Sequence, residues 1–214
     1  AVRSASERIA RVVVASSETV YGPGSVYDGP VAEDALLRPD SPYSAAKRYG
    51  ECLARQYREE YDVPAVALRP TGVFGPFGES FTAYADLFEK PALGEPARVG
   101  GGQTAVSWLY VRDAADAFRR AALVPSSALS QDVYNVAGEV ATVAKAAETV
   151  RETLDDATVE VVDDEDADWS AQRLSLSHTR ADLGYEVRYD LPALVRDYVN
   201  EIRRDAGRQP VEFE

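Results

Sequence analysis

Short apolar runs separated by helical segments are the feature that most limits what this chain can fold into. Residues 11–16 (RVVVAS) and 65–69 (AVALR) are continuous runs rich in β-branched residues, without polar alternation. Such runs are typical of strands buried on both faces of a parallel sheet. Between them, residues 43–61 have helical character, with Pro42 suited to a first helical position and Ser41 to an N-cap. The alternation predicts an α/β fold built on a parallel sheet.

The rest of the chain continues this alternation. Further strands are expected over residues 97–99, 106–111, 133–136 and 159–162, with another short one over 174–177. Helices are expected over residues 79–89, 113–123, 142–154 and 191–206, the third of them capped by Thr142. Residues 18–42 contain prolines and glycines without a hydrophobic period, so a long loop is predicted there.

The net charge of the chain limits the classes of protein to which it can belong. Asp and Glu total 36 against 23 Lys and Arg, giving a net charge of −13. Nucleic-acid binding needs a basic footprint, so this charge excludes that class of protein. Only Lys47, Lys90 and Lys145 are lysines, which leaves 20 of the 23 basic residues as arginines. An acidic, lysine-poor surface fits molar salt, where self-repulsion is screened, so we expect a halophilic protein.

Other features of the composition bear on the location of the protein and on whether it holds disulfides or a metal. No stretch approaches the ~18 apolar residues of a membrane span, and the first ten residues are charged where a signal peptide is apolar. A single cysteine excludes an internal disulfide framework and a cysteine zinc site, and a single histidine argues against other metal sites. We therefore expect a cytoplasmic protein without a metal. Cys52 is expected as a small buried residue, and His178 as a surface or capping residue without a partner.

A tyrosine and a lysine stand at the start of the first predicted helix. Tyr43 and Lys47 are four residues apart and therefore lie on one helical face. An ammonium beside a phenol favours the phenolate and lowers the pKa of a tyrosine from its ordinary value of about 10. Such a tyrosine can exchange a proton with a substrate hydroxyl. Because this spacing arises by chance in many helices, the pair alone is weak evidence.

Further motifs accompany that pair in a fixed order along the chain. They are S-S-x-x-V-Y-G at 16–22, P-Y-x-x-x-K at 42–47, R-P-x-x-V-F-G-P at 69–76, Y-V-x-D at 110–113 and Y-N-V at 134–136. In this order and spacing, the set closely resembles the extended short-chain dehydrogenase/reductase family, in its sugar-nucleotide epimerase/dehydratase branch. The resemblance runs from about residue 11 to the LGY at 183–185, which is most of the chain.

The resemblance implies the C-terminal portion of a Rossmann-type, doubly wound parallel sheet with a smaller α/β substrate lobe. Residues 1–76 and 104–140 would form the remainder of the NAD-binding domain, and residues 77–103 and 141–214 mainly the substrate lobe and C-terminal helices. The family's G-x-x-G-x-x-G loop, which cradles the cofactor pyrophosphate, is absent from the 214 residues. We therefore expect that the N-terminal, adenosine-binding part is missing and that this chain alone binds NAD weakly. An unpaired sheet edge at residues 12–14 would make it poorly soluble.

The same resemblance implies an NAD-dependent oxidoreductase that oxidises a sugar carbinol, and it leaves NADP open. Tyr43 is similar to the family's acid/base, and Lys47 to its partner that also holds the nicotinamide ribose. Ser17 is similar to the hydroxyl that bonds the reacting oxygen, with Thr19 as a second one. The residues implied for cofactor binding are Ala15, Ser16, Tyr43, Lys47, Pro70, Thr71, Gly72 and Val73. Those implied for substrate binding are Ser17, Glu18, Thr19, Gly72, Arg98, Arg112 and Arg173.

Three departures from the family pattern leave the substrate open. Dehydratases of the family carry an acid where Thr19 stands, which argues against loss of water. Epimerases carry an asparagine at Gly72 and, at Val106, an arginine that clamps the substrate diphosphate, and losing a bidentate phosphate donor is not conservative. The alternatives are a reductase or dehydrogenase of a small carbonyl compound, or a catalytically inert fragment or binding protein.

The expected partners follow from the same observations. A small-molecule substrate, which in this family can be a nucleotide sugar, is expected, and neither a nucleic acid nor a membrane is. Family members commonly dimerise through helices that include the counterpart of residues 43–61. That segment has apolar or small residues on two faces, so a homodimer is compatible with the sequence.

Overall fold

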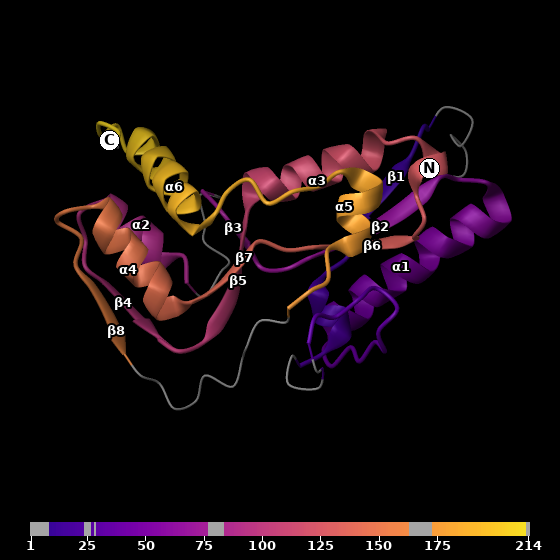
Figure 1. The fold of residues 1–214 in the computed structure, drawn as a ribbon, viewed down its shortest axis with the longest axis horizontal. Coiled ribbons are helices and arrows are strands. Elements are labelled where there is room, and N and C mark those ends of the chain that lie inside the picture. The colour runs from indigo at the N-terminus through magenta and orange to yellow at the C-terminus, as the bar shows by residue number, and fades with distance from the viewer. Residues whose placement is uncertain (1–8, 24–26, 28, 77–83, 163–172, 213–214) are drawn as a thin grey trace. The chain divides into compact units, whose positions relative to one another are not determined.

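The chain divides into two compact units in a computed structural model that describes residues 9–23, 27, 29–76, 84–162 and 173–212 (Figure 1). The first unit comprises Ala1–Thr71, Arg112–Ala137 and Gln172–Val187. The second comprises Gly72–Val111, Gly138–Ala171 and Arg188–Glu214. The chain thus passes between the units several times, and each unit is built from segments that are distant in sequence.

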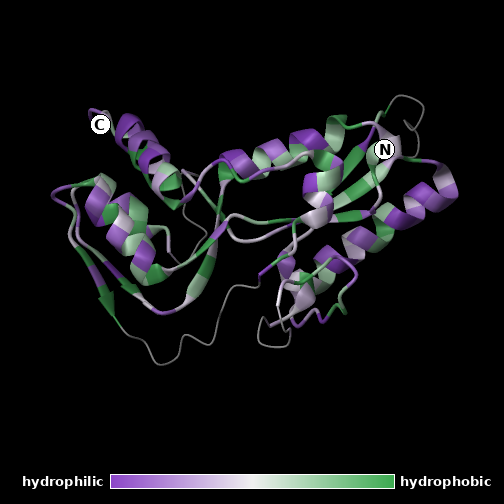
Figure 2. Ribbon diagram, in the orientation of Figure 1, coloured by the Kyte–Doolittle hydropathy of each residue, from purple (hydrophilic) through white to green (hydrophobic). Residues whose placement is uncertain are grey.

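A three-stranded parallel sheet forms the centre of the first unit. Its strands are β1 (Val12–Ala15), β2 (Ala65–Pro70) and β6 (Val133–Val136), in the order β1-β2-β6. Val13 pairs with Val66, and Leu68 pairs with Tyr134. The central strand β2 is buried along nearly its whole length, and hydrophobic residues, green in Figure 2, make up β1 and the first part of β2. The parallel α/β fold expected from the apolar runs is therefore present.

The helices of this unit lie on both sides of its sheet. They are α1 (Pro42–Tyr61), α3 (Val111–Leu123) and the short α5 (Ser177–Leu183), and Figure 1 shows α1 and α3 on opposite sides. α1 begins as the sequence predicts, because the Ser41 side chain accepts from the backbone N–H of Ser44 while Ser44 bonds back to Ser41. It packs against β1 and β2. Residues 18–42, expected as a loop, contain the short 3₁₀ helix η2 (Glu18–Tyr21), and a second such turn, η4, covers Ser126–Ala128.

β1 forms one edge of the sheet among the described residues. It pairs with β2 on one side, and its three valines are only partly buried. An unpaired strand edge is a template for association with other chains. The strand edge on which the expected poor solubility depends is therefore present among the described residues. The poor solubility itself stays a prediction.

The second unit is built on two small sheets. One has the order β3-β5-β7, with strands Val73–Phe74, Ala105–Tyr110 and Glu139–Thr142. The other pairs β4 (Ala97–Gly100) with β8 (Val159–Val162) in parallel. The helices α2 (Asp86–Ala92), α4 (Val143–Thr153) and α6 (Leu191–Asp205) complete this unit. The side chain of Thr142 caps α4 by accepting from the N–H of Lys145, as the sequence predicts.

Trp108 lies at the centre of the second unit's core. It is completely buried, and its ring centroid lies 4.7 Å from that of Phe74 and 5.6 Å from that of Phe88. Phe88 in turn stacks on Tyr198 of α6, at 5.3 Å. Trp108 therefore serves the packing of this core. Trp169 lies outside the described residues.

The strand β7 is absent from the sequence-based prediction, and a close backbone approach explains its presence. β7 runs antiparallel to β5, with Trp108 opposite Glu139. At the neighbouring Gly138, a Cβ atom would lie 2.0 Å from the carbonyl oxygen of Trp108. Only glycine permits this approach, because any side chain would collide with backbone.

The structure differs from the sequence-based expectations at several further points. Residues 174–177 do not form a strand: Leu174 makes an isolated bridge to Val31, and α5 begins at Ser177. Part of the helix expected over 79–89 lies outside the described residues, and the observed helix α2 begins later. Residues 104–111 group with the second unit because β5 pairs with β3 and β7. Residues 172–187 group with the first because α5 packs on β6.

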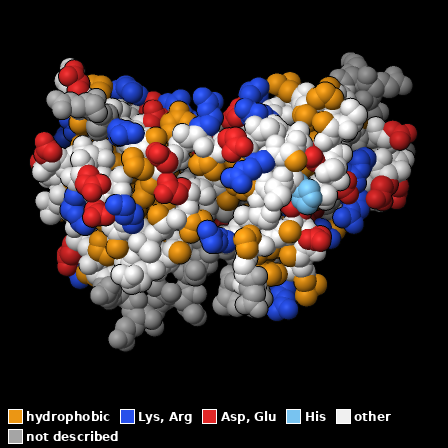
Figure 3. Space-filling view, in the orientation of Figure 1, with side chains coloured by type: hydrophobic (Ala, Val, Ile, Leu, Met, Phe, Trp, Pro, Cys, Tyr) orange, Lys and Arg blue, Asp and Glu red, His pale blue; other side chains and the backbone are white. Residues whose placement is uncertain are grey.

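The surface carries charges of both signs. Acidic and basic side chains are interspersed on the face shown in Figure 3. Cys52 is exposed, so the expectation that it is buried is wrong; its position on α1 faces away from the sheet. None of the helices in the described part of the chain is both long enough and apolar enough to cross a membrane. The described residues also contain no cluster of three or more side chains suited to hold a metal.

Candidate active site

The first turns of α1 bring Tyr43 and Lys47 to the carboxyl end of β1. The Nζ atom of Lys47 donates a hydrogen bond of 2.9 Å to the carbonyl oxygen of Ala15, the last residue of that strand. The same Nζ lies 5.4 Å from the centroid of the Tyr43 ring. Tyr43 is 56% exposed, so its phenol is open to a ligand. The helical face predicted from the four-residue spacing is therefore present.

The segment directly after β1 carries the expected hydroxyl groups. Ser17 caps η2: its Oγ accepts from the Thr19 backbone N–H at 3.2 Å and from the Thr19 hydroxyl at 3.0 Å. A hydroxyl that accepts two bonds can still donate its own hydrogen to a third group. Glu18 is buried in the same turn. Because η2 also packs against α1, the hydroxyls of Ser17 and Thr19 belong to the same end of the unit as Lys47.

A buried ion pair links α1 to the sheet just beyond Lys47. Glu51, one turn further along α1, receives two hydrogen bonds from Arg69 of β2, at 2.7 and 2.9 Å. It also accepts from the Ser16 hydroxyl at 2.5 Å and from Arg48 at 2.9 Å. Both members of the pair have nearly inaccessible side chains. Burial alone would raise the pKa of the Glu51 carboxyl, but the bonds and charge of Arg69 outweigh it and lower that pKa, so Glu51 is ionised.

Arg69 extends this contact to the far end of η2. Its Nη1 donates to the Tyr21 hydroxyl at 2.7 Å and to the backbone carbonyl of Glu33 at 3.0 Å. Its guanidinium carbon lies 4.8 Å from the Tyr21 ring centroid. Burial raises the pKa of Tyr21 to about 12, even though the Arg69 cation opposes the change, so the phenol is a neutral donor. It donates to Asn135 of β6 at 2.7 Å.

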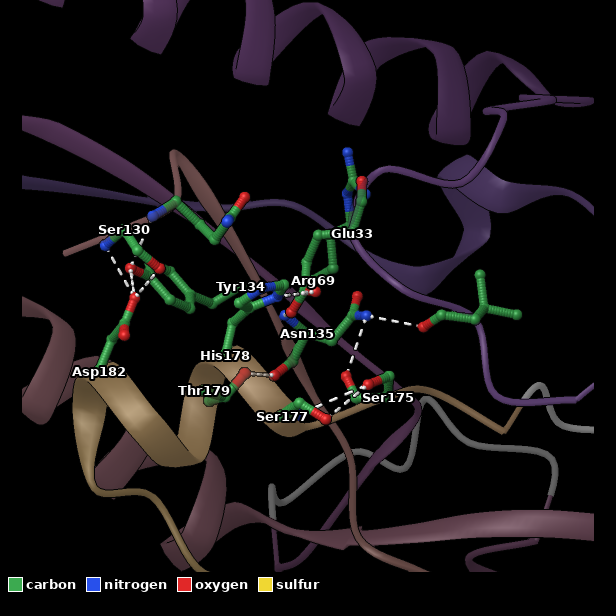
Figure 4. Close-up of polar contacts among 12 residues, drawn as sticks. Glu33, Arg69, Ser130, Tyr134, Asn135, Ser175, Ser177, His178, Thr179 and Asp182 are labelled. Carbon is green, nitrogen blue, oxygen red and sulfur yellow. Dashed lines mark hydrogen bonds and ion pairs between the residues drawn. The ribbon is translucent and has the colours of Figure 1, made fainter.

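Asn135 connects this buried cluster to the surface histidine (Figure 4). Its backbone N–H donates to one carboxylate oxygen of Glu33 at 3.0 Å, and the other oxygen lies 2.9 Å from Nδ1 of His178. The His178 side chain is 43% exposed. The expectation of a surface position holds, but the histidine has a partner because α5 brings it over Glu33. The hydrogen bond with Glu33 raises the pKa of His178.

Glu51, Arg69, Tyr21, Asn135 and Glu33 are absent from the site residues expected from the sequence. Two signals point to the first pair: an acid stands four residues after Lys47, and an arginine ends an otherwise apolar buried run. A charge in a fully buried strand needs a buried partner, so that pattern calls for a search for one.

The structure places the other expected site residues in both units. Pro70 ends β2, and Thr71 is buried with its N–H bonded to the carbonyl of Val136. Gly72 and Val73 open the second unit, and a Cβ on Gly72 would make only an ordinary contact with the Phe74 ring, at 3.7 Å. The remaining expected residues are three exposed arginines: Arg98 on β4, 3.6 Å from Glu160, Arg112 in the first turn of α3, and Arg173.

These groups fit one end of a dinucleotide cofactor. A lysine ammonium has three donors, and Lys47 uses one of them on Ala15, which leaves two for ribose hydroxyls. Tyr43 and the open carboxyl end of a parallel strand lie beside it, the position at which α/β sheets bind ligands. The phosphate-cradling glycine loop is not part of the 214 residues. The fit therefore concerns the nicotinamide end alone.

Comparison with known proteins finds several curated relatives of this chain. "Low-salt glycan biosynthesis protein Agl12" of Haloferax volcanii is 36% identical over 49% of this chain and 34% of that protein. UDP-glucose 4-epimerase of Mycolicibacterium smegmatis is 34% identical over 51% of this chain and 36% of the epimerase. A dTDP-glucose 4,6-dehydratase of Neisseria meningitidis serogroup B is 27% identical over 92% of this chain and 52% of the dehydratase. The chain thus spans a third to a half of these relatives.

Solved structures share the fold, and the family follows from the sequence match. A GalE-like L-threonine dehydrogenase from Cupriavidus necator superposes with a TM-score of 0.81 and 27% identity, covering 94% of this chain and 74% of the dehydrogenase. The model of the NAD dependent epimerase/dehydratase family matches residues 1–137, well over half of the 214 residues. The chain therefore belongs to the NAD-dependent epimerase/dehydratase family.

Proposed function

We propose that this chain supplies the proton-transfer groups of an NAD-dependent oxidoreductase that acts on the sugar of a nucleotide sugar. One observation carries the proposal: Lys47 is fixed on the carbonyl of Ala15 with its ammonium beside the exposed ring of Tyr43. An ammonium held in this place can stabilise the negative charge that develops beside it during proton transfer. The names of the epimerase and dehydratase relatives support a nucleotide sugar as the substrate class.

The chemistry divides between the cofactor and the side chains. NAD, when bound, supplies the acceptor for a hydride. Tyr43 as phenolate takes the proton of a sugar hydroxyl as the carbon–hydrogen bond breaks, and the hydroxyl becomes a carbonyl. Ser17 donates to the reacting oxygen while Thr19 holds the Ser17 hydroxyl in orientation. Lys47 binds ribose hydroxyls with its free donors and keeps a positive charge beside Tyr43.

Between epimerisation and dehydration, this site favours epimerisation. Expelling water needs a group that protonates the leaving hydroxyl. Thr19 is not acidic, and the neighbouring Glu18 is buried in the turn. An epimerase needs only one acid/base pair and the return of the hydride to the opposite face, which the groups of this site can support.

A second candidate is a dehydrogenase of a small alcohol. Val106 is buried in the core of the second unit, so that position offers no cation for a diphosphate. The likeness to the L-threonine dehydrogenase extends over 94% of this chain. Such an enzyme would use Tyr43, Lys47 and Ser17 in the same roles on a smaller substrate.

Exchange of Tyr43 for phenylalanine tests the proposal. Loss of the acid/base should lower turnover of UDP-glucose or dTDP-glucose with NAD by about 10²–10⁴-fold, with the fold retained. Tyr49→Phe is the matched control, because Tyr49 is also an exposed tyrosine of α1 but is 64% exposed and further along the helix. Assays with L-threonine in parallel distinguish the second candidate. In a preparation in which the unsubstituted protein turns over one of these substrates, equal turnover by Tyr43→Phe and Tyr49→Phe would refute both.

A further inference from the structure

We propose that Glu51 and Arg69 are positioning residues for the reacting groups of this site. They hold the hydroxyl-bearing segment 16–19 in fixed register with the face of α1 that carries the proposed acid/base. This assignment rests on the proposed function, because only that function gives the reacting groups their roles. The contacts of Glu51 and Arg69 do not depend on the proposed function.

Two contacts, one helical turn apart, fix α1 to the end of β1. Lys47 donates to the carbonyl of Ala15. One turn later, Glu51 accepts from the hydroxyl of Ser16, the next residue of the strand's extension. Two successive contacts prevent α1 from rotating or sliding relative to the strand. Ser17, directly after this anchor, therefore has a defined position relative to α1.

Arg69 holds the same segment at its other end. One edge of its guanidinium makes the two bonds to Glu51, and Nη1 reaches the Tyr21 hydroxyl at the end of η2. The turn with Ser17 and Thr19 is thus clamped between an anchor at residue 16 and one at residue 21. Both anchors meet at one guanidinium.

The chemistry of this pair suits positioning better than it suits stability. A buried ion pair often adds little to stability compared with apolar residues of the same volume. The planar fork of arginine, however, fixes direction as well as distance, and lysine cannot reproduce it. Preorganised hydroxyls and charges need no rearrangement when the substrate binds, which is how such sites lower a barrier.

Amide hydrogen exchange of the 214-residue chain, with and without Glu51→Gln, tests the assignment without cofactor or turnover. The amides of Thr19, Val20 and Gly22 report on the turn because each donates within it. We expect their exchange to accelerate on the order of tenfold relative to amides of α3. The Lys47 ammonium signal should change as well, while those of Lys90 and Lys145, the other two lysines, stay constant.

Asp182→Asn is the matched control, since Asp182 is another carboxylate of the same unit that accepts several bonds. It receives the Ser130 N–H and hydroxyl and the Tyr134 hydroxyl, at 2.8, 2.6 and 2.6 Å (Figure 4). This variant should leave the turn amides and Lys47 unchanged. A uniform acceleration of all amides by Glu51→Gln, or the same turn response to Asp182→Asn, would show a merely structural role and overturn the proposal.

Tyr21→Phe provides a test that keeps the ion pair intact, should Glu51→Gln fail to fold. It removes one hydroxyl that joins Arg69 to η2. Faster exchange of the turn amides with an unchanged Lys47 signal is expected, and unchanged exchange would overturn the proposal. In a preparation with Tyr43-dependent turnover, Glu51→Gln should lower kcat while KM for NAD is retained. The expected exchange pattern together with full activity of Tyr43→Phe would instead refute the proposed function and leave the contacts standing.

Discussion

At the scale of single residues, a buried carboxylate affects the protonation of a partly exposed histidine. Glu33 has a side chain only 3% exposed, yet it meets a half-exposed histidine. His178 is the single histidine of the chain and is visible on the face shown in Figure 3. Asp34 and Asp182 add further negative charge around it, and together with the Glu33 bond they favour the imidazolium. Because these interactions raise the pKa of His178 in the folded state, protonation of this imidazole is coupled to folding.

We predict that His178→Gln changes the pH dependence of stability. The folded-state pKa of His178 is raised, so its contribution is fully present below the ordinary value of about 6.5 and is lost as pH rises through the folded value. The urea midpoint of the unsubstituted chain should therefore fall, relative to the variant, from about pH 6.5 upward. Parallel curves would contradict this. The single imidazole resonance in an NMR titration gives the folded pKa independently.

At the scale of elements, the two faces of α1 have different roles. Its inner face holds Lys47 and Glu51 on the sheet. Its outer face carries exposed small or apolar residues at helical spacing, Ala45, Tyr49 and Cys52, which form a stripe suited to another helix. A homodimer, which is compatible with the sequence, would use this stripe.

We predict that Tyr49→Glu prevents self-association of the chain. A symmetric helix pair would bring two new carboxylates together and bury them without partners, at a cost of several kcal/mol. Leu123→Glu is the control, because Leu123 is 70% exposed at the end of α3, on the opposite side of the sheet. Sedimentation velocity should show a dimer for the unsubstituted chain and for this control. A concentration-independent monomer in all three samples would refute the prediction.

At the scale of the whole molecule, the net charge of −13 governs the response to solvent. Like charges repel over a Debye length of about 10 Å at 0.1 M salt, which shrinks to about 3 Å at 1 M. The internal ion pairs of the first unit, such as Arg69 with Glu51, are buried and are screened much less. Salt should therefore weaken the repulsion between surface carboxylates without breaking the buried ion pair between Arg69 and Glu51.

The expected halophily leads to a direct measurement. The midpoint of thermal unfolding should rise between 0.1 and 2 M KCl, because the compact state gains most from screening. A scan in sorbitol of matched osmolarity separates charge screening from preferential exclusion. A midpoint that is flat or falls with KCl would place this chain among ordinary acidic proteins.

The sequence by itself determined the features that depend on neighbours along the chain. The apolar, β-branched runs became the parallel strands β1 and β2, of which β2 is buried at the centre of the sheet and β1 is partly buried at its edge. α1 began at Pro42 because Ser41 and Ser44 cap it locally, and Tyr43 and Lys47 share a face because the helix repeats every 3.6 residues. The order of motifs was enough to indicate the family and the cofactor class.

Only the tertiary structure decided which distant groups meet. β7 has no apolar run of its own and forms because Gly138 lets it approach β5. Cys52 is exposed because its helical position points away from the sheet, which composition does not reveal. Arg69 and Glu51 are 18 residues apart and become a buried pair only when β2 and α1 pack. A charged side chain can be buried when an oppositely charged partner is buried beside it. Which residues become such partners depends on how the elements pack.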